Sequence, residues 1–307
     1  MTRLQTRFAH VPLTGGPSPV RRLDLPGEVW VKDDGGIGTV YGGNKVRKLE
    51  WTLADAKAKG ATCVLTGGAL ATNHGLATAL YARELGLRTT LLLVDQPMDD
   101  HVAAAFARLQ ATGARIHRAR TPRRAYALAP WVYLRSTGRR RPYWLPVGGS
   151  SPLGVLGFVE AGLELAEQVE AGELPLPARV VLAVGSGGCA AGLLVGLQLA
   201  GLTTQVHGVL VNDATPVTHE SVLQMAVGAA RLVGVPAPRD GLVLDTRWLG
   251  PGYGHPTAEA TAAAAVLAEQ GVSTEPVYTA KAAAALLDLP PGEPVLFWQT
   301  HNTRPLD

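Results

Sequence analysis

The chain has 307 residues, of which 47% are hydrophobic and 17% charged, and its formal net charge is +3. This composition excludes a disordered chain, and so small a net charge implies no strong attraction to nucleic acid or to a membrane surface. Two cysteines, Cys63 and Cys189, are too few for a disulfide framework or a cysteine-built metal site, so we expect no metal and a cytoplasmic protein. The N-terminal stretch lacks the apolar core of a signal peptide, and no apolar run is long enough to span a bilayer.

Strand-like and helix-like segments alternate along the first half of the chain. Val46, Leu49, Leu53 and Ala56 have the spacing of one helix face, and Gly60 ends that segment. The pattern then predicts strands over 61–65, 88–94 and 114–119, and helices over 76–86 and 102–113. Such an order indicates a parallel sheet covered by helices on both faces.

The stretch 123–149 interrupts this alternation with aromatic residues, arginines and prolines. A long helix over 154–172 follows, and a second alternating set begins with a strand over 178–184. We interpret the interruption as a crossing between domains. The sequence therefore predicts a two-domain α/β protein with a smaller domain over 47–150 and a larger one formed by 1–46 and 151–307.

A glycine-rich loop follows the strand over 178–184. Gly185, Ser186, Gly187 and Gly188 lead into a helix that begins at about Cys189. Glycine backbone and a helix N-terminus together favour a phosphate group, although a tight turn without a ligand has the same pattern. A dinucleotide site is a third interpretation, but the glycines do not match G-x-G-x-x-G. No histidine or carboxylate is assigned beside Cys189, which favours a small loop residue over a thiolate nucleophile.

A second loop places Thr72, Asn73 and His74 at the expected start of the helix that contains 76–86. Threonine or asparagine is a common N-cap, which explains part of this pattern without any ligand. Three polar residues in a row also suit the binding of a substrate carboxylate by backbone N–H groups. The sequence alone leaves both interpretations open.

The stretch "YGGNKVRKLE" places Lys45 in the first turn of a helix and Lys48 one turn further on. Taken alone, this pattern favours the solvated basic start of a helix. A lysine among positive charges and glycine backbone is also able to lose its proton and form a Schiff base. A phosphate-binding loop elsewhere in the same chain favours the second interpretation, because pyridoxal phosphate carries both an aldehyde and a phosphate.

Several motifs resemble one known family, in order from about residue 30 to 300. They are "KDDGGIGTVYGGNKVRKLE", "TNHGLATA", "PVGGSSPLGVLGFVEAGLELA", "VGSGGCAAGL", "GYGHP" and "PVYTAKA". The resemblance is to the D-cysteine desulfhydrase and 1-aminocyclopropane-1-carboxylate (ACC) deaminase family. It implies a three-layer αβα, fold-type II (tryptophan synthase β-like) enzyme, with pyridoxal phosphate held between two domains, a small amino-acid substrate and a homodimer.

The resemblance also implies a role for individual residues. Lys45 carries the cofactor and, with Tyr253 and Tyr278, forms the catalytic set; both tyrosines also face the substrate. Lys48, Asn73, Ser186, Gly187, Gly188 and Cys189 hold the cofactor, chiefly its phosphate. Thr72, Asn73 and His74 receive the substrate carboxylate, and Thr279 lies at the cofactor's ring nitrogen.

Two positions bear on the substrate. Gln299–Asn302 reads "QTHN" where the family has "H-T-G-G" close to the cofactor ring, so we expect an altered pocket. Thr279 stands where the deaminases have glutamate, and an uncharged hydroxyl suits β-elimination better than chemistry that needs a strong electron sink. We therefore expect a pyridoxal-phosphate-dependent lyase that gives a keto acid and ammonia. The alternatives are an ACC deaminase, an NAD(P)-dependent oxidoreductase and a non-catalytic binding protein with the same fold.

Overall fold

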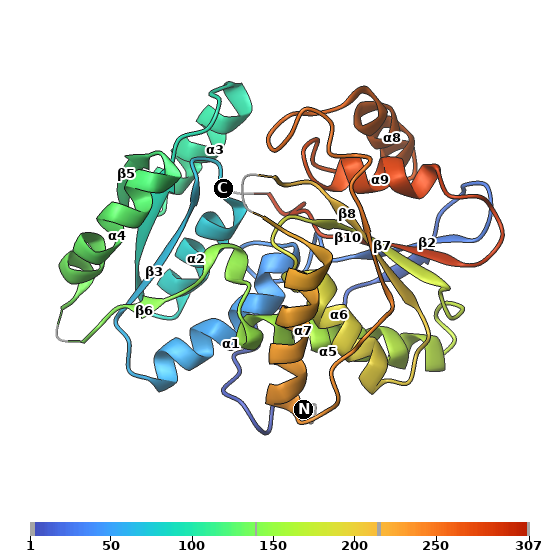
Figure 1. The fold of residues 1–307 in the computed structure, drawn as a ribbon, viewed down its shortest axis with the longest axis horizontal. Helices are drawn as coiled ribbons and strands as arrows, with labels where there is room; N and C mark the ends of the chain where they lie inside the picture. Colours follow the sequence, from blue (N-terminus) through green and yellow to red (C-terminus); the bar gives the residue numbers. More distant parts are fainter. Residues whose placement is uncertain (1–3, 139, 214–215, 306–307) are drawn as a thin grey trace. The chain divides into compact units, whose positions relative to one another are not determined.

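The structure is a computed structural model that describes residues 4–138, 140–213 and 216–305 (Figure 1). The chain forms two compact units. One comprises Leu49–Gly149 with the N-terminal segment that ends at Pro12, and the other comprises Leu13–Lys48 and Ser150–Asp307. In the described ranges no helix combines the length and the apolar character needed to cross a membrane.

The smaller unit is built on a parallel sheet with the strand order β5-β4-β3-β6. Consecutive side chains of a strand point to opposite faces of a sheet. In β4, Leu91 lies against Gly75 of α2, whereas Leu92 packs with Val132 of α4, so these two helices cover opposite faces (Figure 1). The elements are β3 (Cys63–Ala69), α2 (Asn73–Glu84), β4 (Arg88–Val94), α3 (Asp100–Ala111), β5 (Arg115–Arg120), α4 (Pro122–Ser136), β6 (Tyr143–Trp144) and a short 3-10 turn, η1 (Val147–Gly149).

Helix α4 lies within the stretch 123–149, so the alternation of strands and helices continues where the sequence pattern indicated an interruption. Thr121 caps the helix by accepting a hydrogen bond from the Arg124 N–H, and Pro122 occupies the first turn, where its missing N–H costs nothing. Ala125, Ala129 and Val132 pack towards the sheet at helical spacing. Pro130 inside the helix and the exposed arginines obscured this spacing in the sequence.

The larger unit is built on a six-stranded sheet with the order β1-β2-β10-β7-β8-β9. Only the pairing of β1 with β2 is antiparallel among its described strands. Its strands are β1 (Val20–Arg22), β2 (Val29–Asp33), β7 (Arg179–Val184), β8 (Gln205–Leu210), β9 (Leu242–Asp245) and β10 (Val295–Gln299). Its helices are the start of α1 (Asn44–Ala58), α5 (Pro152–Glu170), α6 (Gly188–Leu199), α7 (His219–Val233), α8 (Ala258–Glu269) and α9 (Thr279–Leu287).

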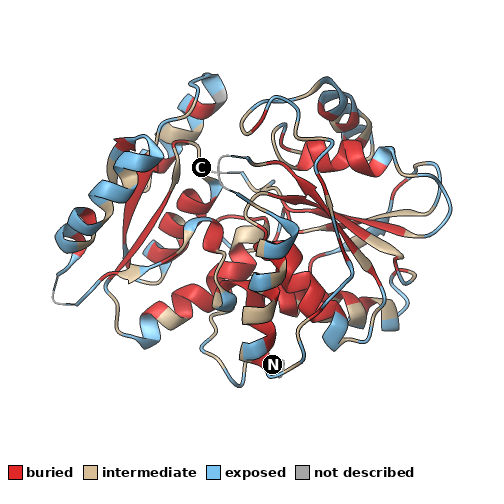
Figure 2. Ribbon diagram, viewed as in Figure 1, coloured by how far each residue is buried: buried red, intermediate tan, exposed pale blue. Residues whose placement is uncertain are grey.

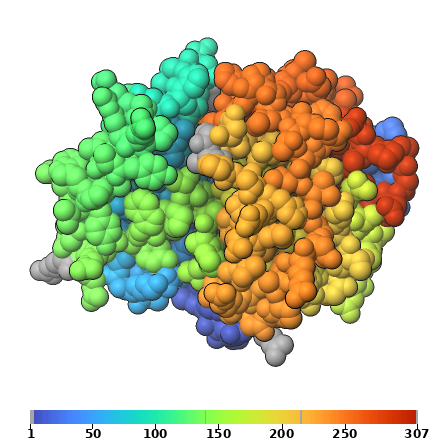
Figure 3. All heavy atoms as spheres, viewed as in Figure 1, coloured from blue at the N-terminus to red at the C-terminus, as the bar shows by residue number. Residues whose placement is uncertain are grey.

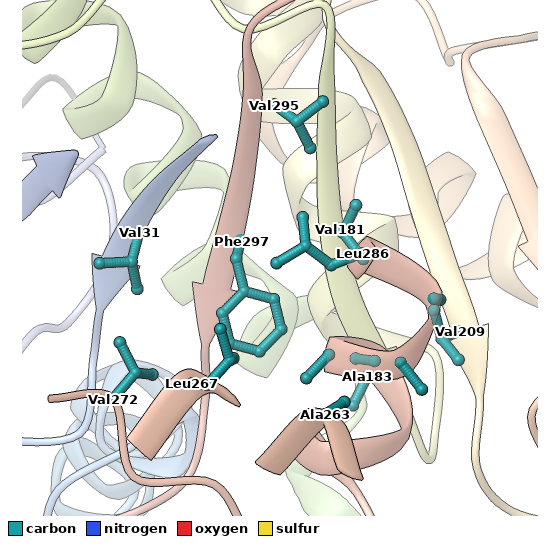
Figure 4. Packing of buried hydrophobic residues seen from close by; sticks show 14 of the residues in the cluster. Val31, Val181, Ala183, Val209, Ala263, Leu267, Val272, Leu286, Val295 and Phe297 are labelled. Carbon is teal, nitrogen blue, oxygen red and sulfur yellow. The ribbon is translucent and has the colours of Figure 1, made fainter. Parts of the chain in front are cut away.

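Helices cover both faces of this sheet, with α8 and α9 on one side and α5, α6 and α7 on the other (Figure 1). Strands β7, β8 and β10 are buried almost throughout (Figure 2). Phe297 of β10 and Val181 of β7 pack against Leu286 of α9 and Leu267 of α8 (Figure 4). The expected α/β class with a three-layer αβα arrangement is thereby confirmed.

Helices α5 and α6 approach each other closely because glycines face one another. A Cβ placed at Gly162 of α5 would lie 2.9 Å from the Gly196 Cα of α6. Helix α7 then packs over both helices, and its side chains, gold to orange, lie in the foreground of this unit in the space-filling view (Figure 3). The close packing holds α6 against α5, and the N-terminal end of α6 follows the glycine-rich loop.

Candidate active site

Lys45 lies in the first turn of α1, directly after Asn44 and two glycines. Its amine donates a hydrogen bond to the Asn44 side-chain oxygen at 2.9 Å. Loss of solvation around the amine, together with the positive charge of Lys48, lowers the pKa of Lys45 to about 8. At pH 7 roughly a tenth of an amine with this pKa is unprotonated, and the unprotonated amine is the form that attacks an aldehyde.

Lys48 lies one turn further along α1 and is 1% exposed. Its amine donates to the Ser150 hydroxyl at 3.1 Å, and that hydroxyl lies 2.8 Å from the Ser186 hydroxyl. A Cβ placed at Gly188 would lie 2.8 Å from the Lys48 Nζ and 2.5 Å from the Ser150 Oγ. Because Gly188 has no side chain, the Lys48 amine and the hydroxyls of Ser150 and Ser186 are able to lie close to its backbone.

Helix α6 begins at this point, and its N-terminus suits an anion. The N-cap, Gly187, has φ +80° and no side chain with which to cap the helix. The first N–H groups of a helix have no acceptor within the helix, and they carry partial positive charge. Together with the Lys48 ammonium and the hydroxyls of Ser150 and Ser186, they form a cradle that fits a phosphate group.

Cys189, in the first turn of α6, connects this cradle to Lys45. Its buried sulfur accepts a hydrogen bond from the Asn44 side-chain amide at 3.3 Å. The same amide accepts from the Lys45 amine, so Asn44 bridges the lysine and the loop. Asn44 and Ser150 were not predicted as site residues, although each lies inside a motif on which the family resemblance rests.

Tyr253 and Tyr278 form a pair in the larger unit. Tyr253 lies in the connection between β9 and α8, and Tyr278 directly precedes α9. The Tyr278 hydroxyl donates to the Tyr253 hydroxyl at 3.0 Å, and the rings meet edge to face with centroids 5.9 Å apart. Burial raises the pKa of both phenols, so both remain protonated at neutral pH and are able to donate a proton.

The tyrosine pair adjoins the glycine-rich loop. A Cβ placed at Gly185 would lie 3.0 Å from Cε1 of the Tyr278 ring. The Tyr253 backbone N–H donates to the Asp213 carboxylate at 2.8 Å, and the buried Lys281 donates to the Leu249 carbonyl at 2.7 Å. Asp213 thus holds the segment that carries Tyr253.

Thr279 is the first residue of α9 and is 1% exposed. Its hydroxyl oxygen accepts a hydrogen bond from the Glu275 backbone N–H at 2.7 Å. The Glu275 carboxylate accepts from the backbone N–H groups of Val277 and Tyr278, which fixes the segment before the helix. A threonine hydroxyl that accepts one bond still has its own proton to donate.

Thr72, Asn73 and His74 lie in the smaller unit at the start of α2. Thr72 is the N-cap of this helix, and its hydroxyl accepts from the Gly75 N–H at 3.1 Å. Asn73 is exposed, while His74 is buried with its Nε2 3.1 Å from the Thr66 hydroxyl. The capping interpretation therefore holds for Thr72, and the substrate-binding role of the three residues stays a prediction.

Gln299–Asn302 begins at the last residue of β10 and continues into the segment after that strand. Gln299 is fully buried, and its amide donates to the Ser273 carbonyl. The Thr300 carbonyl accepts from the Asn44 backbone N–H at 3.1 Å. The segment thus contacts the turn that precedes Lys45.

Comparison with known proteins places these residues in a family. The model of the family described as "Pyridoxal-phosphate dependent enzyme" matches residues 11–300. The D-cysteine desulfhydrase of Salmonella paratyphi A is 35% identical over 299 residues, which cover 92% of this chain and 89% of that protein. The D-cysteine desulfhydrase of Yersinia pestis (strain Pestoides F) is 34% identical over 302 residues, with 92% and 88% covered.

Solved structures agree with the sequence matches. A structure described as an ACC deaminase homologue has a TM-score of 0.84 and 31% identity, covering 98% of this chain and 95% of its own. A serine racemase from Dictyostelium discoideum has a TM-score of 0.66 and 15% identity, covering 93% and 92%, and shows the shared fold alone. The nicotinamide and non-catalytic alternatives are therefore set aside. The chain belongs to the family of pyridoxal-phosphate-dependent enzymes, and it is a lyase that removes a β-substituent from a small amino acid.

Proposed function

We propose that this lyase acts on D-cysteine, releasing sulfide, ammonia and a keto acid with the uptake of one water molecule, and that Lys45 is its central residue. The observation that supports this most directly is the Lys45 amine, whose pKa is lowered to about 8 and which Asn44 connects to the phosphate-binding loop at Cys189. The two relatives compared above are both named D-cysteine desulfhydrase. We therefore propose D-cysteine as the substrate of this chain as well.

The residues of the larger unit suit pyridoxal phosphate. Lys45 would bind it covalently, and Thr279 would donate to its ring nitrogen. When bound, the cofactor supplies an electron sink for the electron pair left at the substrate's α-carbon. The phosphate would be held by Lys48, Ser150, Ser186 and the N–H groups of Gly187, Gly188 and Cys189. We also propose that Asn73, which belongs to the smaller unit, contacts the cofactor.

Proton transfer falls to three side chains. The unprotonated amine of Lys45 is the base for the α-proton, because its pKa is lowered to about 8 and the unprotonated form is accessible at neutral pH. Tyr253 and Tyr278 are protonated, so their pair is the proton source for the departing sulfur. We propose that Thr72, Asn73 and His74 bind the substrate carboxylate through the N-terminus of α2, with Thr72 acting as its cap.

Comparing D-cysteine with ACC as substrates of the same preparation tests the substrate proposal. With the neutral Thr279 at the ring nitrogen, we expect keto-acid release from D-cysteine at least 10-fold faster than from ACC, on the order of 1.4 kcal/mol in barrier height. The reason is that a good β-leaving group relieves the negative charge at the α-carbon by departing, whereas the ring opening of ACC offers no such departure. A preference for ACC would contradict the proposal and would favour the deaminase alternative, which the ACC deaminase homologue among the structures supports.

Replacing Lys48 by alanine should weaken retention of the cofactor. Loss of its ammonium from the cradle is expected to raise the concentration of pyridoxal phosphate needed for half-saturation by roughly 10- to 100-fold, as for a charge-assisted hydrogen bond. Added cofactor should restore much of the activity. Absorbance after dialysis measures retention, and Lys59→Ala, which removes an exposed lysine paired with Asp55, is the control. If the Lys48→Ala variant retains as much pyridoxal phosphate as the parent, Lys48 does not bind the cofactor phosphate.

Three further expectations are part of the proposal. We propose a homodimer, which the family resemblance implies and which sedimentation would test. We propose a cytoplasmic setting, which suits the free, buried Cys63 and Cys189. We also propose 47–150 as the smaller domain, with 1–46 and 151–307 as the larger one.

A further inference from the structure

Asn302 lies in the segment after β10, far along the chain from Lys45, yet it contacts the turn that leads to that lysine. Its side-chain oxygen accepts a hydrogen bond from the Gly42 N–H at 2.6 Å and from the Arg304 N–H at 3.2 Å. Its side-chain nitrogen donates to the Arg304 carbonyl at 3.2 Å. The asparagine amide therefore holds its own loop and Gly42 at once.

The same turn is held at neighbouring positions. The Asn44 N–H donates to the Thr300 carbonyl at 3.1 Å, and the Gly43 N–H donates to the Asp34 carbonyl at 2.7 Å. The Thr303 N–H donates to the Gly35 carbonyl at 3.0 Å, which ties the two flanking segments together. Gly42–Asn44 is thus enclosed by residues 34–35 on one side and 300–303 on the other.

This enclosure explains the two glycines before Lys45. A Cβ at Gly42 would collide with the Gly35 carbonyl oxygen and lie 3.0 Å from the Asn302 side-chain oxygen. Gly43 has φ +77°, and a Cβ there would lie 2.7 Å from the Thr300 carbonyl oxygen. The glycines are required by the close approach of protein backbone, whether or not a ligand is bound.

We propose that Asn302 is a positioning residue for Lys45. Gly42 is buried, so its N–H needs an acceptor within the protein, and Asn302 is the side chain that provides one. Gly42 in turn precedes the first turn of α1, so fixing its N–H fixes the direction in which the Lys45 side chain leaves the helix. The proposal rests on the role proposed above for Lys45.

Asn302→Ala and Asn302→Asp, made in the full-length protein isolated with its cofactor, test this role. The alanine variant lacks the acceptor, whereas aspartate retains a side-chain oxygen for both N–H groups. We expect hydrogen exchange in the peptide spanning residues 42–48 to quicken roughly 10-fold in the alanine variant, the size of one lost hydrogen bond at a buried amide. We also expect kcat to fall by about 10-fold with KM changed less than about 2-fold, because ground-state binding of substrate is retained.

Aspartate cannot donate to the Arg304 carbonyl, but its oxygen still accepts from the Gly42 N–H, so exchange over residues 42–48 should return to within about 3-fold of the parent. Gln198→Ala is the matched control, because it removes an amide that donates to the Pro236 carbonyl on the surface of the same unit. Unchanged exchange over residues 42–48 in the alanine variant would overturn the proposal. Faster exchange spread evenly over the unit would also overturn it, by showing general destabilisation. The exchange result does not depend on which lysine binds the cofactor, so failure of the proposed function would be seen separately.

Discussion

Replacing Lys45 by alanine is expected to abolish both the visible absorption band of bound pyridoxal phosphate and turnover of D-cysteine, while the protein remains folded. The amine is the group that would join the cofactor covalently, and its lowered pKa, about 8, provides the unprotonated form. Removing both the attachment and the base should reduce turnover by at least about 1,000-fold. The measurements are the absorption spectrum and keto-acid release, with circular dichroism as the test of folding.

A second buried lysine provides the control for this experiment. Lys281 is fully buried, and burial lowers its pKa, so it also has properties of a reactive lysine. Its amine donates, however, to the carbonyls of Leu249 and Gly252, so its role is to hold the segment before Tyr253. Lys281→Met is therefore expected to keep the band. A band lost in Lys281→Met and retained in Lys45→Ala would show that our proposal assigns the cofactor to the wrong lysine.

The parts of the site that follow from local sequence were predictable. Lys45 and Lys48 come from one helical turn, and the loop from Gly185 to Cys189 has the composition of a strand-to-helix turn that accepts an anion. The contacts of Ser150 with Lys48 and of Asn302 with Gly42 were not predicted, because they join residues 102 and 260 positions apart in the sequence respectively. A single sequence carries no signal for a contact between segments so far apart.

The same distinction applies to the fold. Alternating apolar segments were enough to predict parallel sheets, because the strands in the middle of a parallel sheet are apolar throughout. Helix α4 was not predicted because Pro130 interrupts the helical spacing of its apolar residues, although Thr121 and Pro122 are typical of a helix N-terminus. The pairing of β2 with β10 was also beyond prediction, since Lys32 and Trp298 become neighbours only when the ends of the chain meet in one sheet.

Arg47 stands between the two proposed cofactor lysines in sequence but lies in a different environment. Its buried guanidinium donates to both oxygens of Asp34 at 2.9 and 2.8 Å and to both oxygens of Glu164 at 2.8 and 3.0 Å, and also to the Ser18 hydroxyl at 3.0 Å. The amine of Lys32 donates to the same Glu164 at 2.5 Å. This cluster connects the start of α1 to α5 and to the loop after β2. Gly157 of α5 allows the approach, since a Cβ there would collide with the Arg47 carbonyl.

Replacing Arg47 by methionine is expected to lower the free energy of unfolding by about 3–5 kcal/mol, the cost of leaving buried carboxylates without their partner. Methionine keeps much of the side-chain volume, so the loss reports on charge and hydrogen bonding rather than on a cavity. Urea unfolding monitored by circular dichroism measures it. The matched control is Arg118→Met, because Arg118 pairs with Asp95 and both side chains are exposed to solvent that screens the pair. Equal losses in the two variants would contradict the role given to the buried cluster.

The same cluster predicts how stability depends on pH. Burial alone would raise the pKa of Glu164, but the charges of Arg47 and Lys32 and their hydrogen bonds lower it to about 2, below its ordinary value of 4.5. A carboxyl group whose pKa is depressed in the folded state contributes stability that is present above its ordinary pKa and is lost as the pH falls through the folded value. The parent should therefore lose this contribution between about pH 4.5 and pH 2. In Arg47→Met the pKa of Glu164 should be lowered less, so the free energy of unfolding of the variant should fall less than that of the parent across this pH interval. If the free energies of unfolding of both proteins fall in parallel with pH, Arg47 is not the residue that keeps Glu164 ionised.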